Sequence, residues 1–410
     1  MSSRKNFNPL LRLIKWYGIS CLIFFLVFPS PLFSQEDFSL HLNLGVAYYH
    51  QGQYERSKEE FLKALRLVPD SFEAHYNLSL VYIAQKDFLS AERELKNCLE
   101  LNSDYPELHF QLGNVYFYQK LFPQAANEYK KELEKNPAHT PSLYNLAKVF
   151  QIQGRLEEAE RTLEKVKQLE PDFPGIYTDL GEIYYQQGKM EKALQILEKA
   201  VEKESTNIFP YIYLGRIYQE KENYQKAEKM LCKAVEIDPG NFYAQLELGY
   251  LYLKIQNYSS AISYLEKAIK INPEDLYARY YLGYAYTQLK RVDDAIAQYN
   301  LIIDKKGRFE DTYLLLGNLY YEKKDFEKAI FFYLKEVEVN PENTDALFNL
   351  ANVYFQKGSL DEAESSLKKL LEVAPDDSLA HSLLGDVYMK KNMYDKAIAE
   401  YEKAKVGQSE

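Results

Sequence analysis

The fold is decided by the stretch FYAQLELGYLYLKIQNYSSAISYLEKAIKINPED, residues 242–275. In its first half, Leu248, Gly249 and Tyr252 share one helical face, because residues three and four apart in a helix are neighbours. A polar turn follows, and the second half has the apolar spacing of another amphipathic helix. Pro273 closes the stretch, since proline cannot continue a helix. The sequence here therefore predicts a helical hairpin.

The same pattern recurs in register from Phe38 to Glu410, without insertion or deletion. Each unit has one small residue in its first half, which we call the step residue. Leucine precedes it in every unit, and tyrosine follows three positions later except at Phe150. Alanine follows twelve positions later except at Ser57. The step residues are Gly45, Ser79, Gly113, Ala147, Gly181, Gly215, Gly249, Gly283, Gly317, Ala351 and Gly385. A regular period of this length is typical of a repeat architecture.

Most units close with proline, and a few depart from the pattern. Ser103, Ser205 and Gly307 replace the closing proline. Glu132 and Glu336 replace the residue five positions before it, which is usually small. We expect these departures to alter packing only locally.

The pattern resembles that of the tetratricopeptide repeat family, over essentially all of the chain after the N-terminal segment. The resemblance implies an all-α fold, a right-handed α-solenoid superhelix of eleven 34-residue helix-turn-helix repeats. One hairpin cannot bury its apolar face alone, so neighbours stack into a continuous core. The expected repeats are 38–71, 72–105, 106–139, 140–173, 174–207, 208–241, 242–275, 276–309, 310–343, 344–377 and 378–410. Within them, residues 170–175 contain two prolines and a glycine, and we expect the array to flex there.

Residues 1–34 do not belong to the repeats and have the layout of a secretory signal peptide. Four basic residues up to Lys15 precede an uncharged apolar run, Trp16 to Phe28. This run is shorter than the roughly 20 residues that span a bilayer. We therefore expect cleavage near Gln35, export and a periplasmic location. An uncleaved segment that anchors the protein in the inner membrane is the alternative.

The composition favours a binding protein over an enzyme. The formal charge of −10 gives no basic stripe for nucleic acid. The sequence has no phosphate loop, metal motif or nucleophile elbow, so we expect no catalytic residues, no cofactor and no metal. His41, His75, His109 and His381 share one repeat position, which we interpret as a packing position, because successive repeats lie too far apart to share one ion. Cys98 and Cys232 lie four repeats apart, and we expect no disulfide between them.

A second face of each first helix consists of the residues six and three before the step residue and one and four after it. We call it the groove face, because the family resemblance implies that it lines a concave groove that holds peptides. Aromatic residues predominate on it, and they are densest in repeats seven and eight. We predict that partners bind there, at Tyr243, Leu246, Tyr250, Tyr277, Tyr280 and Tyr284. Asn77, Asn145 and Asn349 resemble an interrupted form of the asparagine ladder of some peptide-binding relatives.

The sequence thus predicts a non-enzymatic scaffold of the cell envelope whose partners are other proteins or peptides. A structural subunit of a secretion or polysaccharide-export complex is the alternative. Contact with the membrane is expected only through the N-terminal segment, if that segment is not cleaved. Ile398 and Tyr401 of the last repeat have no following repeat to cover them, so we expect either a partner protein or a second copy of the chain, through self-association, to cover them.

Overall fold

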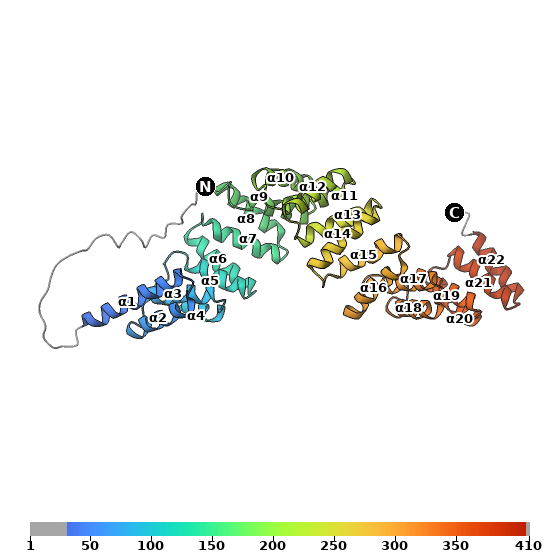
Figure 1. Ribbon diagram of the computed structural model, residues 1–410, viewed down its shortest axis with the longest axis horizontal. Helices are drawn as coiled ribbons and strands as arrows, with labels where there is room; N and C mark the ends of the chain where they lie inside the picture. Colours follow the sequence, from blue (N-terminus) through green and yellow to red (C-terminus); the bar gives the residue numbers. More distant parts are fainter. Residues whose placement is uncertain (1–30, 407–410) are drawn as a thin grey trace. The chain divides into compact units, whose positions relative to one another are not determined.

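The computed structural model describes residues 31–406, and these residues form 22 α-helices and no strand (Figure 1). Consecutive helices pack as pairs, and pairs pack on the pairs that follow them. The all-helical repeat fold predicted from the sequence is therefore confirmed. The signal peptide predicted at residues 1–34 lies almost entirely outside the described residues. None of the helices in residues 31–406 is long and apolar enough to cross a membrane.

The described residues form two compact units, which divide between Glu170 and Pro171. Unit 1 contains α1 (Pro31–His50), α2 (Tyr54–Leu67), α3 (Phe72–Ala84), α4 (Phe88–Leu101), α5 (Leu108–Tyr118), α6 (Phe122–Lys135), α7 (Thr140–Ile152) and α8 (Leu156–Leu169). Unit 2 contains α9 (Ile176–Gln186), α10 (Met190–Lys203), α11 (Phe209–Glu220), α12 (Tyr224–Ile237), α13 (Phe242–Lys254), α14 (Tyr258–Ile271), α15 (Leu276–Gln288), α16 (Val292–Lys306), α17 (Thr312–Glu322), α18 (Phe326–Val339), α19 (Thr344–Lys357), α20 (Leu360–Val373), α21 (Ser378–Lys390) and α22 (Tyr394–Val406). The boundary between the units falls within residues 170–175, the segment where we expected the array to flex. The flexing stays a prediction.

Capping side chains mark where several helices begin, and residues with positive φ form the turns between helices. The first helices α3, α13 and α15 begin after Ser71, Asn241 and Asp275, whose side chains accept a hydrogen bond from a backbone N–H three residues later. Such caps satisfy N–H groups that have no partner inside the helix. The turn between the two helices of each repeat contains one residue with positive φ, for example Gly188 (71°) and Gln256 (59°). Glycine adopts this conformation without strain, which explains its recurrence at this turn.

The step residue lets the two helices of a repeat approach closely. In α17 and α18, a methyl group added at Gly317 would overlap the ring of Tyr333, which is 1% exposed. The residue sixteen positions after the step is aromatic only where the step residue is glycine. These pairs are Gly45/Phe61, Gly113/Tyr129, Gly283/Tyr299, Gly317/Tyr333 and Gly385/Tyr401. Where the step residue is alanine or serine, the partner is always leucine: Ser79/Leu95, Ala147/Leu163 and Ala351/Leu367.

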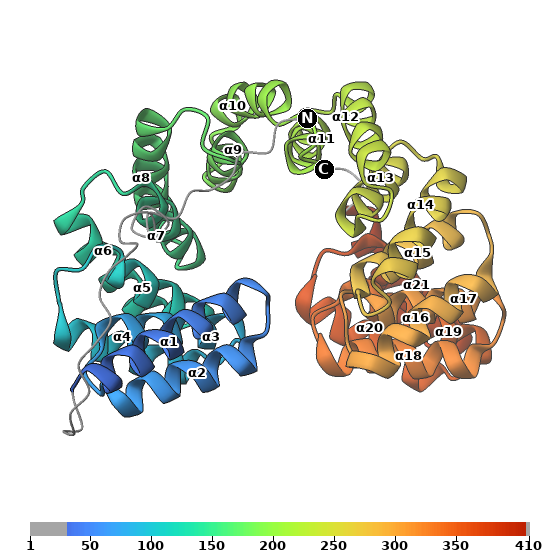
Figure 2. The ribbon, with the colours of Figure 1, turned by 60° about the vertical axis from the view of Figure 1, so that its left-hand side comes forward.

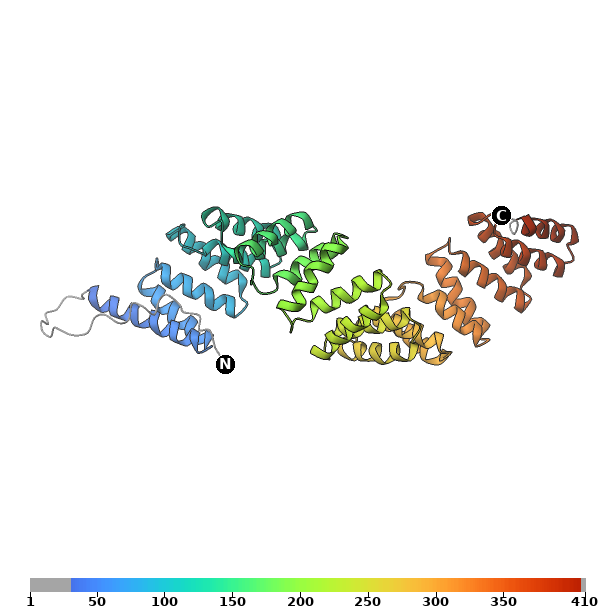
Figure 3. The same cartoon turned by 90° about the horizontal axis from the view of Figure 1, so that it is seen from above.

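Many first helices also contact the first helix of the next repeat, as α1 and α3 or α5 and α7 do in unit 1 (Figure 2). In unit 2, α11, α13 and α15 follow one another in this way, and α17, α19 and α21 do the same (Figure 3). The second helices bury their alanines, for example Ala261 and Ala295, against the first helices. This arrangement leaves one side of the first helices outside the core of the hairpins.

Cys98 is buried and Cys232 is exposed, and neither forms a disulfide in the described structure. Burial raises the pKa of the Cys98 thiol to about 12. The thiolate is the reactive form of cysteine, so this shift makes Cys98 chemically inert near neutral pH.

Candidate functional site

The groove face carries partly exposed aromatic and aliphatic side chains in both units. In unit 1 these include Tyr76, Leu80, Ile83, Phe110, Phe117 and Tyr144. In unit 2 they include Tyr243, Leu246, Tyr250, Tyr277, Tyr280, Tyr284, Leu314, Tyr321, Phe348 and Phe355. The Leu and Tyr side chains on the opposite side of the same helices are largely buried in the core. The groove face therefore offers apolar surface that the fold itself does not fully use.

The six residues predicted to bind partners fall into two groups. Tyr243, Tyr277 and Tyr284 are 52%, 49% and 38% exposed. Leu246, Tyr250 and Tyr280 are partly buried, and Leu246 and Tyr280 pack against the core of unit 2. Only the first three rings are freely available to a partner.

Tyr281, which the sequence analysis did not select, connects several of these rings. Its ring centroid lies 5.1 Å from that of Tyr250, 5.9 Å from that of Tyr280 and 6.3 Å from that of Tyr277. Separations of this size are typical of favourable aromatic pairs. Tyr281 therefore ties α13 and α15 together beneath the exposed rings. Burial raises its pKa to about 12, so the phenol stays protonated.

Phe309, in the loop after α16, was also missed. Its ring meets Tyr277 edge-on at 4.9 Å and Tyr280 at 6.1 Å. The Tyr280 hydroxyl donates a hydrogen bond to Asp311 Oδ1 at 2.6 Å, and burial followed by this contact raises the pKa of Tyr280. Tyr280 thus has a structural role, fastening α15 to the start of α17.

Each unit contains one polar trio, formed by two asparagines of first helices and one tyrosine of a second helix. In unit 1, Asn114 Oδ1 accepts hydrogen bonds from the Tyr129 hydroxyl and from Asn145 Nδ2, both at 2.8 Å. In unit 2, Asn318 Oδ1 accepts equivalent bonds from Tyr333 at 2.8 Å and Asn349 at 3.0 Å. Of the three asparagines that we compared with a ladder, Asn145 and Asn349 thus belong to a trio that includes the preceding repeat. Asn77 does not, since its Nδ2 donates to the backbone carbonyl of Glu73 at 2.8 Å.

The clearest basic residue on the groove face of unit 2 is already paired. Arg216 contacts Glu247 Oε1 through Nε and a terminal nitrogen, both at 2.7 Å. The guanidinium fork therefore links α11 to α13 through a charge-assisted contact. It is not an open clamp for a partner's carboxylate.

The four histidines at one repeat position each pair with a glutamate 19 residues later. The Nδ1–carboxylate distances are 2.6 Å for His41/Glu60, 2.6 Å for His75/Glu94, 2.7 Å for His109/Glu128 and 2.5 Å for His381/Glu400. Glutamate occupies this second position only in these four repeats. The histidines therefore link the two helices of a repeat, in line with a packing role. Residues 31–406 hold no group of three or more metal-binding side chains.

These features define a helical-repeat protein whose groove face is mainly apolar and carries a few polar side chains. Sequence profiles described as tetratricopeptide repeat or TPR repeat match residues 45–105, 110–208, 212–308 and 321–405 when their separate matches are joined. The chain belongs to the tetratricopeptide repeat family. Proteins with this fold are generally non-catalytic scaffolds for interactions between proteins. No curated protein sequence matches the chain.

Solved structures of similar fold include Pseudomonas aeruginosa pilF, which is 20% identical, with a TM-score of 0.45, and covers 52% of this chain and 96% of its own. MamA protein is 22% identical, with a TM-score of 0.40, and covers 42% of this chain and 93% of its own. A human IFIT1 dimer with m7Gppp-AAAA is 19% identical, with a TM-score of 0.47, and covers 92% of this chain and 93% of its own. At these values the likenesses carry no information on function.

Proposed function

We propose that this protein is a non-enzymatic scaffold that holds extended segments of partner proteins along its groove face. The observation that carries the proposal is the polar trio, which is built with the same geometry in both units. In the described structure, the Oδ1 atoms of Asn114 and Asn318 accept two hydrogen bonds, while their Nδ2 groups have no partner. Each free Nδ2 group offers two N–H donors, which suit the carbonyl oxygens of an extended backbone. Neighbouring rings such as Phe348 supply apolar contact.

Site-specific photo-crosslinking tests this proposal in the native cell. A photoreactive amino acid replaces Tyr243 on the groove face or Phe331 on α18, which are 52% and 54% exposed. The two side chains are thus almost equally exposed, but only Tyr243 lies on the groove face. We expect partner proteins to be captured from Tyr243 and not from Phe331. Equal capture at both positions would argue against a groove.

We further propose that the protein acts in the cell envelope, most simply in the periplasm after cleavage near Gln35. The positive, apolar and small-residue order of residues 1–34 supports this location. Sequencing the N-terminus of the natively expressed protein should give Gln35 or a close neighbour. An intact Met1 on protein found in the inner membrane would support the anchored form instead. An intact Met1 on soluble cytoplasmic protein would contradict export.

A role as a structural subunit of a secretion or polysaccharide-export complex stays the alternative. The crosslinked material separates the two functions. Several soluble clients captured at Tyr243 would support the scaffold, and capture of one integral membrane complex would support the accessory subunit.

The last repeat supports a second proposal, self-association between two copies. Ile398 and Tyr394 of α22 are each 56% exposed. At the positions equivalent to Ile398, Ile262 and Ile296 are 8% exposed, because the next repeat packs after them. The exposed face of α22 thus resembles the face that other second helices pack against the next repeat. Within residues 31–406, nothing covers this face of α22. A second copy would cover it through the same surface, as in a two-fold dimer.

Ile398→Asp should abolish this association, because it places a charge in the centre of the apolar face. We expect sedimentation velocity to show a concentration-dependent dimer for the wild type and a monomer for the variant. Leu89→Asp is the matched control, since Leu89 is 78% exposed in unit 1. A wild type that stays monomeric at every concentration would contradict the proposal.

A further inference from the structure

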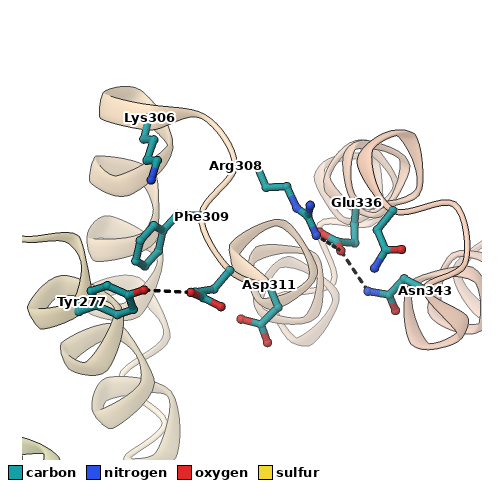
Figure 4. A pocket seen from close by; sticks show the side chains of 9 residues that line it. Tyr277, Lys306, Arg308, Phe309, Asp311, Glu336 and Asn343 are labelled. Carbon is teal, nitrogen blue, oxygen red and sulfur yellow. Dashed lines mark hydrogen bonds and ion pairs between the residues drawn. The ribbon is translucent and has the colours of Figure 1, made fainter. Parts of the chain in front are cut away.

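The loop between α16 and α17 differs from most other repeat junctions and borders a pocket. Gly307 (φ 75°) ends α16 in place of the usual closing proline, and Glu310 has a φ of 48°. The pocket has a volume of about 450 Å³. It is lined by Tyr277, Lys306, Arg308, Phe309, Glu310, Asp311, Glu336, Asn340 and Asn343. In Figure 4, Tyr277 and Phe309 lie on one side, Glu336 and Asn343 on the other, and Arg308 between them.

Glu336 is the exceptional residue of this pocket. It occupies a repeat position that elsewhere holds small or aliphatic residues apart from Glu132, and it is only 1% exposed. Oε1 accepts a hydrogen bond from Asn343 Nδ2 at 3.0 Å, whereas Oε2 is buried and has no hydrogen-bond partner in the described structure. An unsatisfied buried carboxylate oxygen is costly, so the fold retains a strong acceptor here that it does not itself satisfy.

Arg308 is the only cation near this carboxylate in the described structure, and it is poorly placed. Its terminal nitrogen lies 3.9 Å from Glu336 Oε1, too far for a hydrogen bond, and its side chain is 47% exposed. Lys306 instead lies over the ring of Phe309 at 5.5 Å. Together with Glu310 and Asp311, the lining has three carboxylates and two cations, so the pocket favours a positively charged guest.

We propose that this pocket receives the guanidinium group of an arginine side chain from a partner protein, which displaces Arg308. A guanidinium can satisfy both oxygens of a carboxylate through its planar fork. It also stacks on aromatic faces, which Tyr277 and Phe309 provide. An anionic guest would face the three carboxylates. Because Tyr277 also belongs to the groove face, a segment lying there could deliver its arginine directly into the pocket.

This inference deepens the proposed function by naming one chemical feature of the partner, and it rests on that function. Its test uses the full chain and two short peptides, acetyl-Gly-Arg-Gly-amide and the uncharged analogue with citrulline in place of arginine. Saturation-transfer NMR should detect the arginine peptide and give at most about a third of that signal for citrulline. Equal signals for both peptides would overturn the inference. Crosslinking at Tyr243 tests the proposed scaffold function independently of the peptide experiment. A failure of the arginine pocket can therefore be distinguished from a failure of the proposed function.

Two variants assign the binding to this pocket. Glu336→Gln should remove the arginine-peptide signal, whereas Glu132→Gln, at the same repeat position in unit 1 and 4% exposed, should not. Arg308→Ala changes an exposed loop side chain and should strengthen binding at least about threefold, because it removes the internal competitor. Unchanged binding in Glu336→Gln, or weaker binding in Arg308→Ala, would contradict the proposed site.

Discussion

Replacing Gly317 by alanine is expected to destabilise unit 2 by about 1–2 kcal/mol, although alanine is the better helix former. The added methyl group would overlap the Tyr333 ring, which is fully packed between α17 and α18. Overpacking of this kind typically costs about 1–3 kcal/mol. The gain in helix propensity offsets only about 1 kcal/mol. Urea unfolding followed by circular dichroism measures the difference.

The decisive control is a double-mutant cycle with Tyr333→Leu. Repeats four and ten naturally combine an alanine step with leucine, as Ala351 and Leu367 do. In the Tyr333→Leu background, Gly317→Ala should therefore be neutral or stabilising, which gives a coupling of about 1 kcal/mol or more between the two sites. If Gly317→Ala costs the same free energy of unfolding in both backgrounds, the Tyr333 ring is not what requires glycine at this position.

Much of the fold could be predicted because its determinants are local in sequence. The step residue and its aromatic or leucine partner are sixteen positions apart, within one hairpin, and the pattern repeats in all eleven units. The histidine–glutamate pairs could also have been predicted from the sequence, because Glu60 and its three equivalents occur only in the repeats that contain the histidine. The shared repeat position of the histidines was recognised from the sequence, but their glutamate partners were not.

The site was less predictable, because its contacts depend on backbone geometry at a repeat junction. Phe309 reaches Tyr277 and Tyr280 only because the loop after Gly307 turns back toward α15. The missing proline at Gly307 was a visible signal, yet it does not tell where the following side chains lie. The unsatisfied oxygen of Glu336 likewise emerges only when the surrounding residues are placed in three dimensions.

Replacing both Tyr243 and Tyr284 by alanine is expected to weaken partner binding by about 2 kcal/mol or more. Tyrosine rings supply a large contact surface at a low cost in side-chain entropy, and these two are 52% and 38% exposed. Because neither ring is buried in the core, the free energy of unfolding should change by less than about 0.5 kcal/mol. Titration of a partner identified by crosslinking measures the affinity, and urea unfolding measures the stability.

Two further variants separate binding from packing. Phe331→Ala removes a ring of similar exposure from α18 and should leave the affinity unchanged. Tyr280→Ala should instead lower stability by about 3 kcal/mol, because this ring packs on Phe309 and its hydroxyl bonds Asp311. A binding role for the groove face requires the affinity to fall in the Tyr243/Tyr284 variant at full stability. If that variant binds its partner as tightly as the wild type, the rings of repeats seven and eight do not form the contact, and the partner uses another surface.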